Sequence, residues 1–295
     1  NLVAAVAQAG ALAVLPIWSM SVAAAIEKIA ETQSLTSKAF AVNIHADLIQ
    51  HEHIHAAVDQ GISFIHLFWG DPAASSQAIP NGIKMIATVW DEASAKAALD
   101  AGACALIAQG VEAGGHVLGT TRLQELIPAV CSIAGDVPVA AAGGLATAED
   151  IKQVFALGAR AAVFGTRFVA TTESNAHRNY KAAIVNALED TTVRTECFDG
   201  AWPNAPHRVL RNSTFTTWEK AGSPAPPNRP GEGDVILHTA NGQSIPRYFI
   251  SPPAQGMTGE IEAAVMYAGT GIGKIQDNPA VATLIEEIRV DLLAG

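Results

Sequence analysis

Seven short apolar runs, each followed by a segment of helical periodicity, recur along the first 190 residues of this 295-residue chain. Their spacing is roughly 20–30 residues, the length of one βα unit. The runs are apolar on both faces, as parallel strands are when helices cover both sides of a sheet. The sequence therefore predicts an α/β fold built on one parallel sheet. The runs are Ala11–Trp18, Phe40–His45, Ile62–Trp69, Lys84–Trp90, Ala103–Gln109, Val137–Ala142 and Ala161–Phe168.

The number of runs favours a barrel that begins upstream of the printed sequence. The chain opens on a predicted helix, Leu2–Ala9, and an eight-stranded (β/α)8 TIM barrel would place its first strand just before Asn1. We favour this TIM barrel, with its first strand missing before residue 1, over an open sheet. Asp91 and Thr147 are expected to cap the helices Ala93–Ala101 and Ala148–Leu157.

Composition excludes several classes of protein. Apolar residues make up 49% of the chain and charged residues only 16%, which predicts a large buried core and excludes disorder as the main state. The net charge is −10, from 18 basic and 28 acidic side chains, and no run of three basic residues occurs. We therefore expect no nucleic-acid partner. The low charged fraction is compatible with an apolar interface in a homo-oligomer.

Cysteine content and the N-terminal stretch bear on localisation. Three cysteines without a C-x-x-C pair suit a reducing compartment and predict neither disulfides nor a zinc site. Residues 1–26 carry no charge, but Gly10 and Pro16 divide this stretch into pieces of helix and strand length. We expect a cytoplasmic protein with no membrane association.

The texture of the sequence changes after about residue 190. Nine of the 15 prolines fall between Trp202 and Pro253. We expect irregular structure there, followed by helices near Glu260–Ala268 and Pro279–Leu293. The prediction is a barrel over residues 1–190 and an extension over 191–295, which either wraps the barrel or covers the mouth where barrel active sites lie.

Glycine-rich loops after three successive strands carry the strongest functional signal. The stretch 109–116 reads QGVEAGGH, and its paired glycines would let backbone approach a ligand beside His116. Gly143 and Gly144 end the next strand, and Gly165 and Thr166 end the one after. Glycine loops after the last strands of a barrel form a cradle of backbone N–H groups, so these loops predict a phosphate-binding site.

Together these strings resemble the nitronate monooxygenase family, formerly called 2-nitropropane dioxygenases. The strings are QGVEAGGH, PVAAAGGL and VFGTRF, and NLVAAVAQAGALAVL, FAVNIHA and YAGTGIGKIQDNPA are similar to other segments of the family. The resemblance implies an FMN-dependent barrel that oxidises alkyl nitronates, or nitroalkanes, with O2. It implies His116 as the catalytic residue and no metal. The FMN contacts that it implies are Asn43, Gln109, Gly114 and Gly115, with Gly143, Gly144, Gly165 and Thr166 at the phosphate and Thr88 as a further contact on the flavin side.

Other readings stay open beside this one. The same barrel could be an NAD(P)H-dependent flavin reductase of a quinone or an enoyl thioester. It could also bind a phosphorylated metabolite without flavin, or be a degenerate scaffold. The physiological substrate is not readable from the sequence.

Several further side chains invite a functional reading. His45, His51, His53 and His55 suggest a metal site, but only His51 and His55 share a helix face, so a solvated face is the better interpretation. His66 and Trp69 either line the substrate mouth or pack in the core. Glu112 is expected to bond loop N–H groups.

Overall fold

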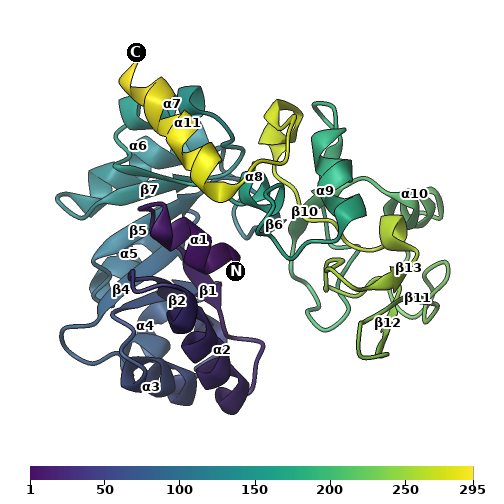
Figure 1. Cartoon of the computed structure of the whole chain (residues 1–295), viewed down its shortest axis with the longest axis horizontal. Helices are drawn as coiled ribbons and strands as arrows, with labels where there is room; N and C mark the ends of the chain where they lie inside the picture. The colour runs from purple at the N-terminus through teal and green to yellow at the C-terminus, as the bar shows by residue number, and fades with distance from the viewer. Residues whose placement is uncertain (295) are drawn as a thin grey trace.

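The computed structural model describes residues 1–294 and contains one curled sheet of seven parallel strands (Figure 1). Their order in the sheet follows the sequence, and each strand pairs with the next, so the predicted α/β alternation is confirmed. Within the described residues β1 and β8 do not pair with each other, so the barrel is not closed. The eighth strand expected ahead of Asn1 stays a prediction. The strands are β1 (Val14–Pro16), β2 (Ala41–His45), β3 (Phe64–Phe68), β4 (Lys84–Val89), β5 (Ala105–Gln109), β7 (Val139–Ala142) and β8 (Ala161–Val163).

Helices cover the outer face of this sheet, and the helices that follow Asp91 and Thr147 begin within one residue of the predicted starts. Asp91 and Thr147 each form a capping box, in which side chain and backbone at the helix start bond reciprocally. The last helix, α11 (Val281–Leu293), packs against the first and against α7, which confirms the second helix expected in the tail. The other helices around the parallel sheet are α1 (Leu2–Gln8), α2 (Val22–Leu35), α3 (His51–Asp59), α4 (Pro72–Ser76), α5 (Glu92–Asp100), α6 (Leu123–Ala134) and α7 (Ala148–Ala156), with the 3-10 turn η1 (Ala46–Leu48).

One predicted strand is shorter than expected. The run Ala161–Phe168 is strand only to Val163, and the short helix α8 (Thr166–Val169) follows at once. Tertiary contacts outweigh the β-propensity of the aromatic residues in this run. Arg167 is buried and pairs with Asp277, and the hydroxyl of Thr166 accepts a hydrogen bond from the amide of Gly269.

The segment from about 175 to 265 forms a second lobe beside the barrel, at the right of Figure 1. The expectation of irregular structure after residue 190 is wrong in part, because short antiparallel strands and the helix Ser213–Lys220 are present there. One sheet has the order β6-β10-β9 and the other the order β12-β11-β13. The elements are β6 (Gly115–His116), α9 (Arg178–Val185), β9 (Thr192–Thr195), β10 (His207–Leu210), α10 (Ser213–Lys220), β11 (Val235–His238), β12 (Ser244–Pro246) and β13 (Thr258–Gly259).

The prediction of a helix near Glu260–Ala268 is also wrong. Only the 3-10 turn η2 (Ile261–Ala263) forms there, and a second 3-10 turn, η3 (Thr270–Lys274), follows. The chain between them is extended because it lies along β10, where the amide of Leu210 donates to the carbonyl of Met266 at 2.8 Å. Helix α9 packs on both turns, while α11 packs on the helices of the barrel. The predicted boundary at residue 190, between the barrel and the extension, stays a prediction.

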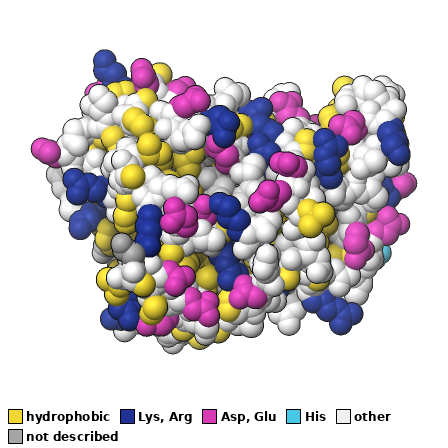
Figure 2. Space-filling view, turned by 90° about the horizontal axis from the view of Figure 1, so that it is seen from above, with side chains coloured by type: hydrophobic (Ala, Val, Ile, Leu, Met, Phe, Trp, Pro, Cys, Tyr) yellow, Lys and Arg dark blue, Asp and Glu magenta, His cyan; other side chains and the backbone are white. Residues whose placement is uncertain are grey.

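The surface mixes both signs of charge. Acidic and basic side chains are interspersed over the face seen in Figure 2. None of the helices within residues 1–294 combines the length and the hydropathy needed to span a membrane.

Two ion pairs tie the segment around η3 to the ends of the barrel strands. Lys274 contacts the buried carboxylate of Asp150 at 2.5 Å, and Asp277 contacts the buried guanidinium of Arg167 at 2.6 Å. Asp150 also accepts hydrogen bonds from the amides of Ala146 and Thr147 at the start of α7. These contacts hold a distant part of the chain against the loops after β7 and β8.

Asp150→Ala should therefore cost more stability than Asp91→Ala, although both remove a helix cap. Loss of a cap costs about 1 kcal/mol, and Asp150 additionally loses its pairing with Lys274, so we expect roughly twice that cost or more. Urea denaturation of both variants measures the difference. Equal free energies of unfolding for the two variants would contradict the tie through Lys274.

Candidate active site

The glycine loops meet at the carboxyl ends of the strands and line one cavity of about 130 Å³. Six of the ten predicted site residues lie together in its wall. No Asp or Glu is among the residues that line it. They are Gln109, Ala113, Gly114, Ala142, Gly143, Gly144, Leu145, Val163, Gly165, Thr166, Gly269, Gly271 and Ile275.

Glycine is required at this cavity because backbone packs directly on backbone. Gly144 has φ +69, and a Cβ there would lie 2.7 Å from the hydroxyl of Thr270. A Cβ at Gly114 would lie 2.5 Å from the amide nitrogen of Gly269. Gly165 differs, since a Cβ there would meet no atom within 4 Å. Besides apolar side chains, the wall offers glycine backbone, the amide of Gln109 and the hydroxyl of Thr166, without carboxylates, and these groups suit a phosphate.

Contacts at both ends brace the loop that carries His116. The carboxylate of Glu112 accepts a hydrogen bond from the amide of Leu123 at 3.0 Å, as expected, and Arg208 donates two to the carbonyl of Val111. Gly115 lies outside the cavity wall and pairs with Arg208 across β6 and β10. The second lobe therefore fixes the position of this loop.

The imidazole of His116 lies in a cluster of aromatic rings. It stacks on Trp202 with ring centroids 4.1 Å apart and an angle of 22° between the planes. Trp69, His207 and Tyr267 contact it at centroid distances of 5.7, 5.4 and 5.5 Å. Its Nε2 atom is buried and has no hydrogen-bond partner among the described residues.

Burial keeps His116 neutral. Desolvation, with smaller contributions from His207 and His45, lowers the pKa of His116 to about 3. The ring therefore carries an unprotonated nitrogen at neutral pH, and an unpartnered acceptor of this kind can take a proton or a hydrogen bond from a ligand.

Asn43 and Thr88 lie on other strands, where His66 joins them. The amide of Asn43 donates to Nδ1 of His66 at 3.2 Å, and Nε2 of His66 lies 2.8 Å from the hydroxyl oxygen of Thr88. Burial lowers the pKa of His66 to about 4, so the ring is neutral with its proton on Nε2. Thr88 thus accepts from His66 and keeps its own proton to donate.

Several residues of the site escaped the sequence analysis. Trp202 and His207 lie in a segment expected to be irregular, and Tyr267 lies in a stretch expected to be helical, so no periodicity points to them as site residues. Gly269 and Gly271 belong to a fourth glycine-rich string, YAGTGIGK, which could have been recognised as a further part of the cradle.

The histidines of α3 bond to backbone. Nε2 of His51 lies 3.0 Å from the carbonyl of Ala74, and Nε2 of His53 lies 2.8 Å from that of Met20. Residues 1–294 contain no group of three or more His, Cys, Asp or Glu placed to hold a metal ion.

Comparison with known proteins confirms the resemblance noted in the sequence. The family model described as nitronate monooxygenase matches residues 51–291. A nitronate monooxygenase of Paraburkholderia phytofirmans is 30% identical over 281 residues, which cover 78% of this chain and 75% of that protein. The enzymes of this family are flavin-dependent.

Relatives with other names are equally similar. The (3aS,4S,5R,7aS)-5-hydroxy-7a-methyl-1-oxo-octahydro-1H-indene-4-carboxyl-CoA dehydrogenase of Rhodococcus jostii is 34% identical over 228 residues, or 76% of this chain. This chain spans 62% of the length of that relative. The structure of FabK from Thermotoga maritima superimposes with a TM-score of 0.78 at 27% identity, covering 99% of this chain and 88% of that one.

The buried histidines predict a loss of stability in mild acid. The pKa values of His45, His66, His116 and His207 all lie below the ordinary 6.5, with burial as the main cause. Below pH 6.5 the unfolded chain binds more protons, so the free energy of unfolding falls as the pH drops from 6.5 toward 4.

Between pH 6.5 and pH 5 we expect a loss of about 2 kcal/mol for each of His66 and His116, measured by urea denaturation at constant ionic strength. His66→Gln, which cannot titrate, should lose less over the same interval. An unchanged free energy of unfolding at pH 5 would show that these rings are not buried as neutral groups.

Proposed function

The chain belongs to the nitronate monooxygenase family, and we propose that it is an FMN-dependent enzyme that oxidises alkyl nitronates, and nitroalkanes, with O2 to carbonyl compounds and nitrite. The observation that carries this proposal is the buried, unpartnered Nε2 of His116 on the same loop as Gly114, which lines the glycine-rich cavity. The Nε2 atom of His116 can act as the base that removes a proton from carbon, and the glycine-rich cavity fits the phosphate of a flavin mononucleotide.

The cavity residues would hold the cofactor. Backbone at Gly143, Gly144 and Gly165 and the hydroxyl of Thr166 would bind the phosphate, which needs donors and tolerates no nearby carboxylate. Gln109, Gly114 and Gly115, with Asn43 and Thr88 on the neighbouring strands, would contact the rest of the flavin. When bound, the flavin supplies electron transfer and the reaction with dioxygen, which no side chain can provide.

His116 would move one proton. A neutral nitroalkane carries an acidic hydrogen on the carbon next to the nitro group, and Nε2 would accept it because the imidazole is unprotonated at neutral pH. The proton then stays on His116, where the developing negative charge of the nitronate stabilises the imidazolium. A substrate supplied as the nitronate needs no such step.

A second candidate function rests on the relatives. A coenzyme A thioester dehydrogenase and FabK are as similar to this chain as the nitronate monooxygenase is. A flavin reductase or dehydrogenase that acts on a thioester could use the same barrel, with His116 as the proton donor or acceptor.

Anaerobic mixing of the flavin-loaded protein with ethylnitronate and, separately, with NADH distinguishes the two functions. We expect the visible flavin absorbance to fall with the nitronate and to stay nearly constant with NADH. Rapid bleaching by NADH alone, with no response to the nitronate, would favour the reductase.

Gly165→Ala should weaken FMN binding without weakening the fold. The added methyl group meets no protein atom within 4 Å and enters free space at the cavity, where it would displace the phosphate. We expect a loss in FMN affinity of roughly tenfold or more, measured by quenching of flavin fluorescence, with the melting temperature of the apoprotein unchanged. Unaltered FMN affinity would place the phosphate elsewhere.

His116→Asn should retain FMN and lose most activity on neutral nitroalkanes, by roughly 100-fold or more, as expected for removal of a general base. Activity on preformed nitronates should fall much less. In the wild type, kcat/KM for the nitroalkane should not decrease between pH 8 and pH 5 through titration of His116, whose pKa is lowered to about 3. Full activity of the variant on nitroalkanes would eliminate His116 as the base.

A further inference from the structure

Trp202 reaches from the second lobe into the mouth of the barrel. Its indole contacts Trp18, His45 and Trp69, which follow or end the first three strands, at centroid distances of 5.2, 4.8 and 4.8 Å. Rings at these separations are in direct contact. Together with the 4.1 Å stack on His116, they place Trp202 at the centre of the ring cluster.

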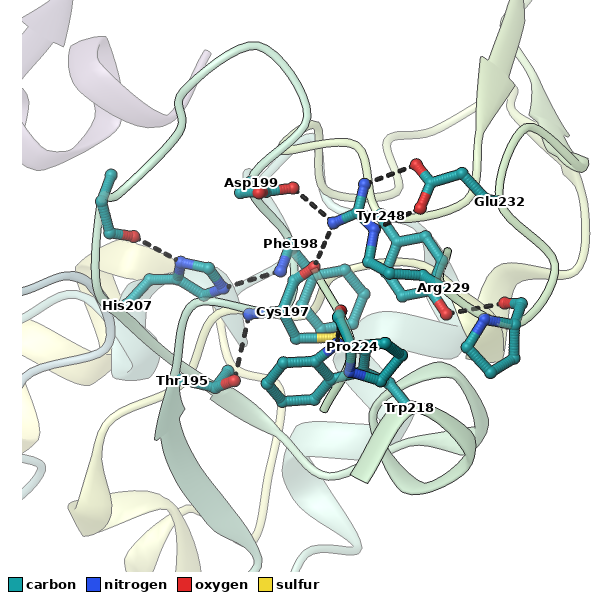
Figure 3. Close-up of polar contacts among 12 residues, drawn as sticks. Thr195, Cys197, Phe198, Asp199, His207, Trp218, Pro224, Arg229, Glu232 and Tyr248 are labelled. Atoms are coloured by element: carbon teal, nitrogen blue, oxygen red, sulfur yellow. Dashed lines mark hydrogen bonds and ion pairs between the residues drawn. The ribbon is translucent and has the colours of Figure 1, made fainter. Parts of the chain in front are cut away.

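A set of buried interactions holds the loop that carries Trp202, residues 199–206. Asp199 pairs with the guanidinium of Arg229 (Figure 3). Arg229 is only 8% exposed. It also pairs with Glu232, and its guanidinium lies over the ring of Tyr248, 4.2 Å from the ring centroid. Removing one partner from a buried pair of this kind leaves an uncompensated charge, so Arg229 fixes Asp199 in one position.

The backbone of the loop is anchored at both ends. At one end the amide of Gly200 donates to the carbonyl of Tyr248 at 2.9 Å, and a Cβ on Gly200 would lie 3.0 Å from the backbone of Phe249. At the other end the amide of Val117, directly after His116, donates to the carbonyl of Pro206 at 2.8 Å.

The backbone beside Trp202 is strained. Ala201, directly before Trp202, adopts a left-handed backbone angle, φ +77, which alanine rarely takes, while Asn204 at φ +57 is of a residue type that tolerates this region. Such strain persists only where the surrounding contacts require it. Trp202 is therefore held as a fixed wall against His116.

We propose, resting on the proposed function, that Trp202 is the substrate-selecting residue of this site. Its indole covers the imidazole of His116. Only substrates with a small group on the reacting carbon then reach the Nε2 atom. Trp202 and His116 are both half-buried, but the Nε2 atom of His116 is buried, and the indole stacks on the imidazole ring with centroids 4.1 Å apart. The indole therefore occupies one face of the imidazole, and a molecule that approaches His116 from that face meets the indole first. Short nitroalkanes such as nitroethane would pass, and branched or cyclic ones would be excluded.

Substrate discrimination tests the selection. In the wild type, kcat/KM should be higher for nitroethane than for nitrocyclohexane, and Trp202→Ala should reduce that ratio by roughly tenfold to 100-fold. Trp202→Phe keeps a ring and should change the ratio less. Trp218→Ala serves as the matched control, because Trp218 lies in the same lobe, bonds to the carbonyl of Pro224 (Figure 3) and packs on Phe215 rather than on His116. A ratio that is the same in Trp202→Ala and in the wild type overturns the proposal.

Chemical labelling tests the covering of His116 without any turnover. Diethylpyrocarbonate modifies neutral imidazoles, and mass spectrometry reports the rate at each histidine. Trp202→Ala should label His116 about tenfold faster than the wild type does, while His53 and His55 on α3 and the Trp218→Ala control stay unchanged. Equal rates at His116 overturn the proposal. A wild-type chain that oxidises no nitro compound contradicts the proposed function, and labelling then decides on its own whether Trp202 covers His116.

Discussion

The site depends on one contact. Backbone from the C-terminal part of the chain packs directly on the loops that follow the barrel strands. A Cβ at Gly271 would lie 2.1 Å from the carbonyl oxygen of Gly144, so neither this approach nor the cavity beside it could form with larger residues. The ion pairs of Asp150 with Lys274 and of Arg167 with Asp277 hold the two segments together. The cavity is thus a joint product of segments more than 100 residues apart in sequence.

Exclusion of water is the second condition that the fold imposes. The second lobe places Trp202, His207 and Tyr267 around His116, and the resulting desolvation keeps the imidazole uncharged. The same lobe braces the His116 loop through Arg208. A barrel alone would supply the glycine cradle, and the lobe adds the dry surroundings in which a neutral base can act.

The sequence predicts the parts of this architecture that depend on local pattern. Apolar runs locate all seven strands of the parallel sheet. Asp91 and Thr147 mark helix starts because capping chemistry is local. The second lobe could not be predicted in this way, since its short strands depend on partners far away: His116 pairs with His207 in an antiparallel sheet. The role of Trp202 follows from that pairing and from the buried Arg229, neither of which leaves a periodic signal. His66 is visible as a polar residue within a predicted strand, but its link between Asn43 and Thr88 needs the register of three strands.

The affinity of the apoprotein for FMN relative to riboflavin tests the central claim most directly, because the two flavins differ only by the phosphate. If the glycine-walled cavity binds that phosphate, FMN should bind on the order of 100-fold more tightly, in line with several charge-assisted hydrogen bonds. Equal affinities for FMN and riboflavin would contradict the account.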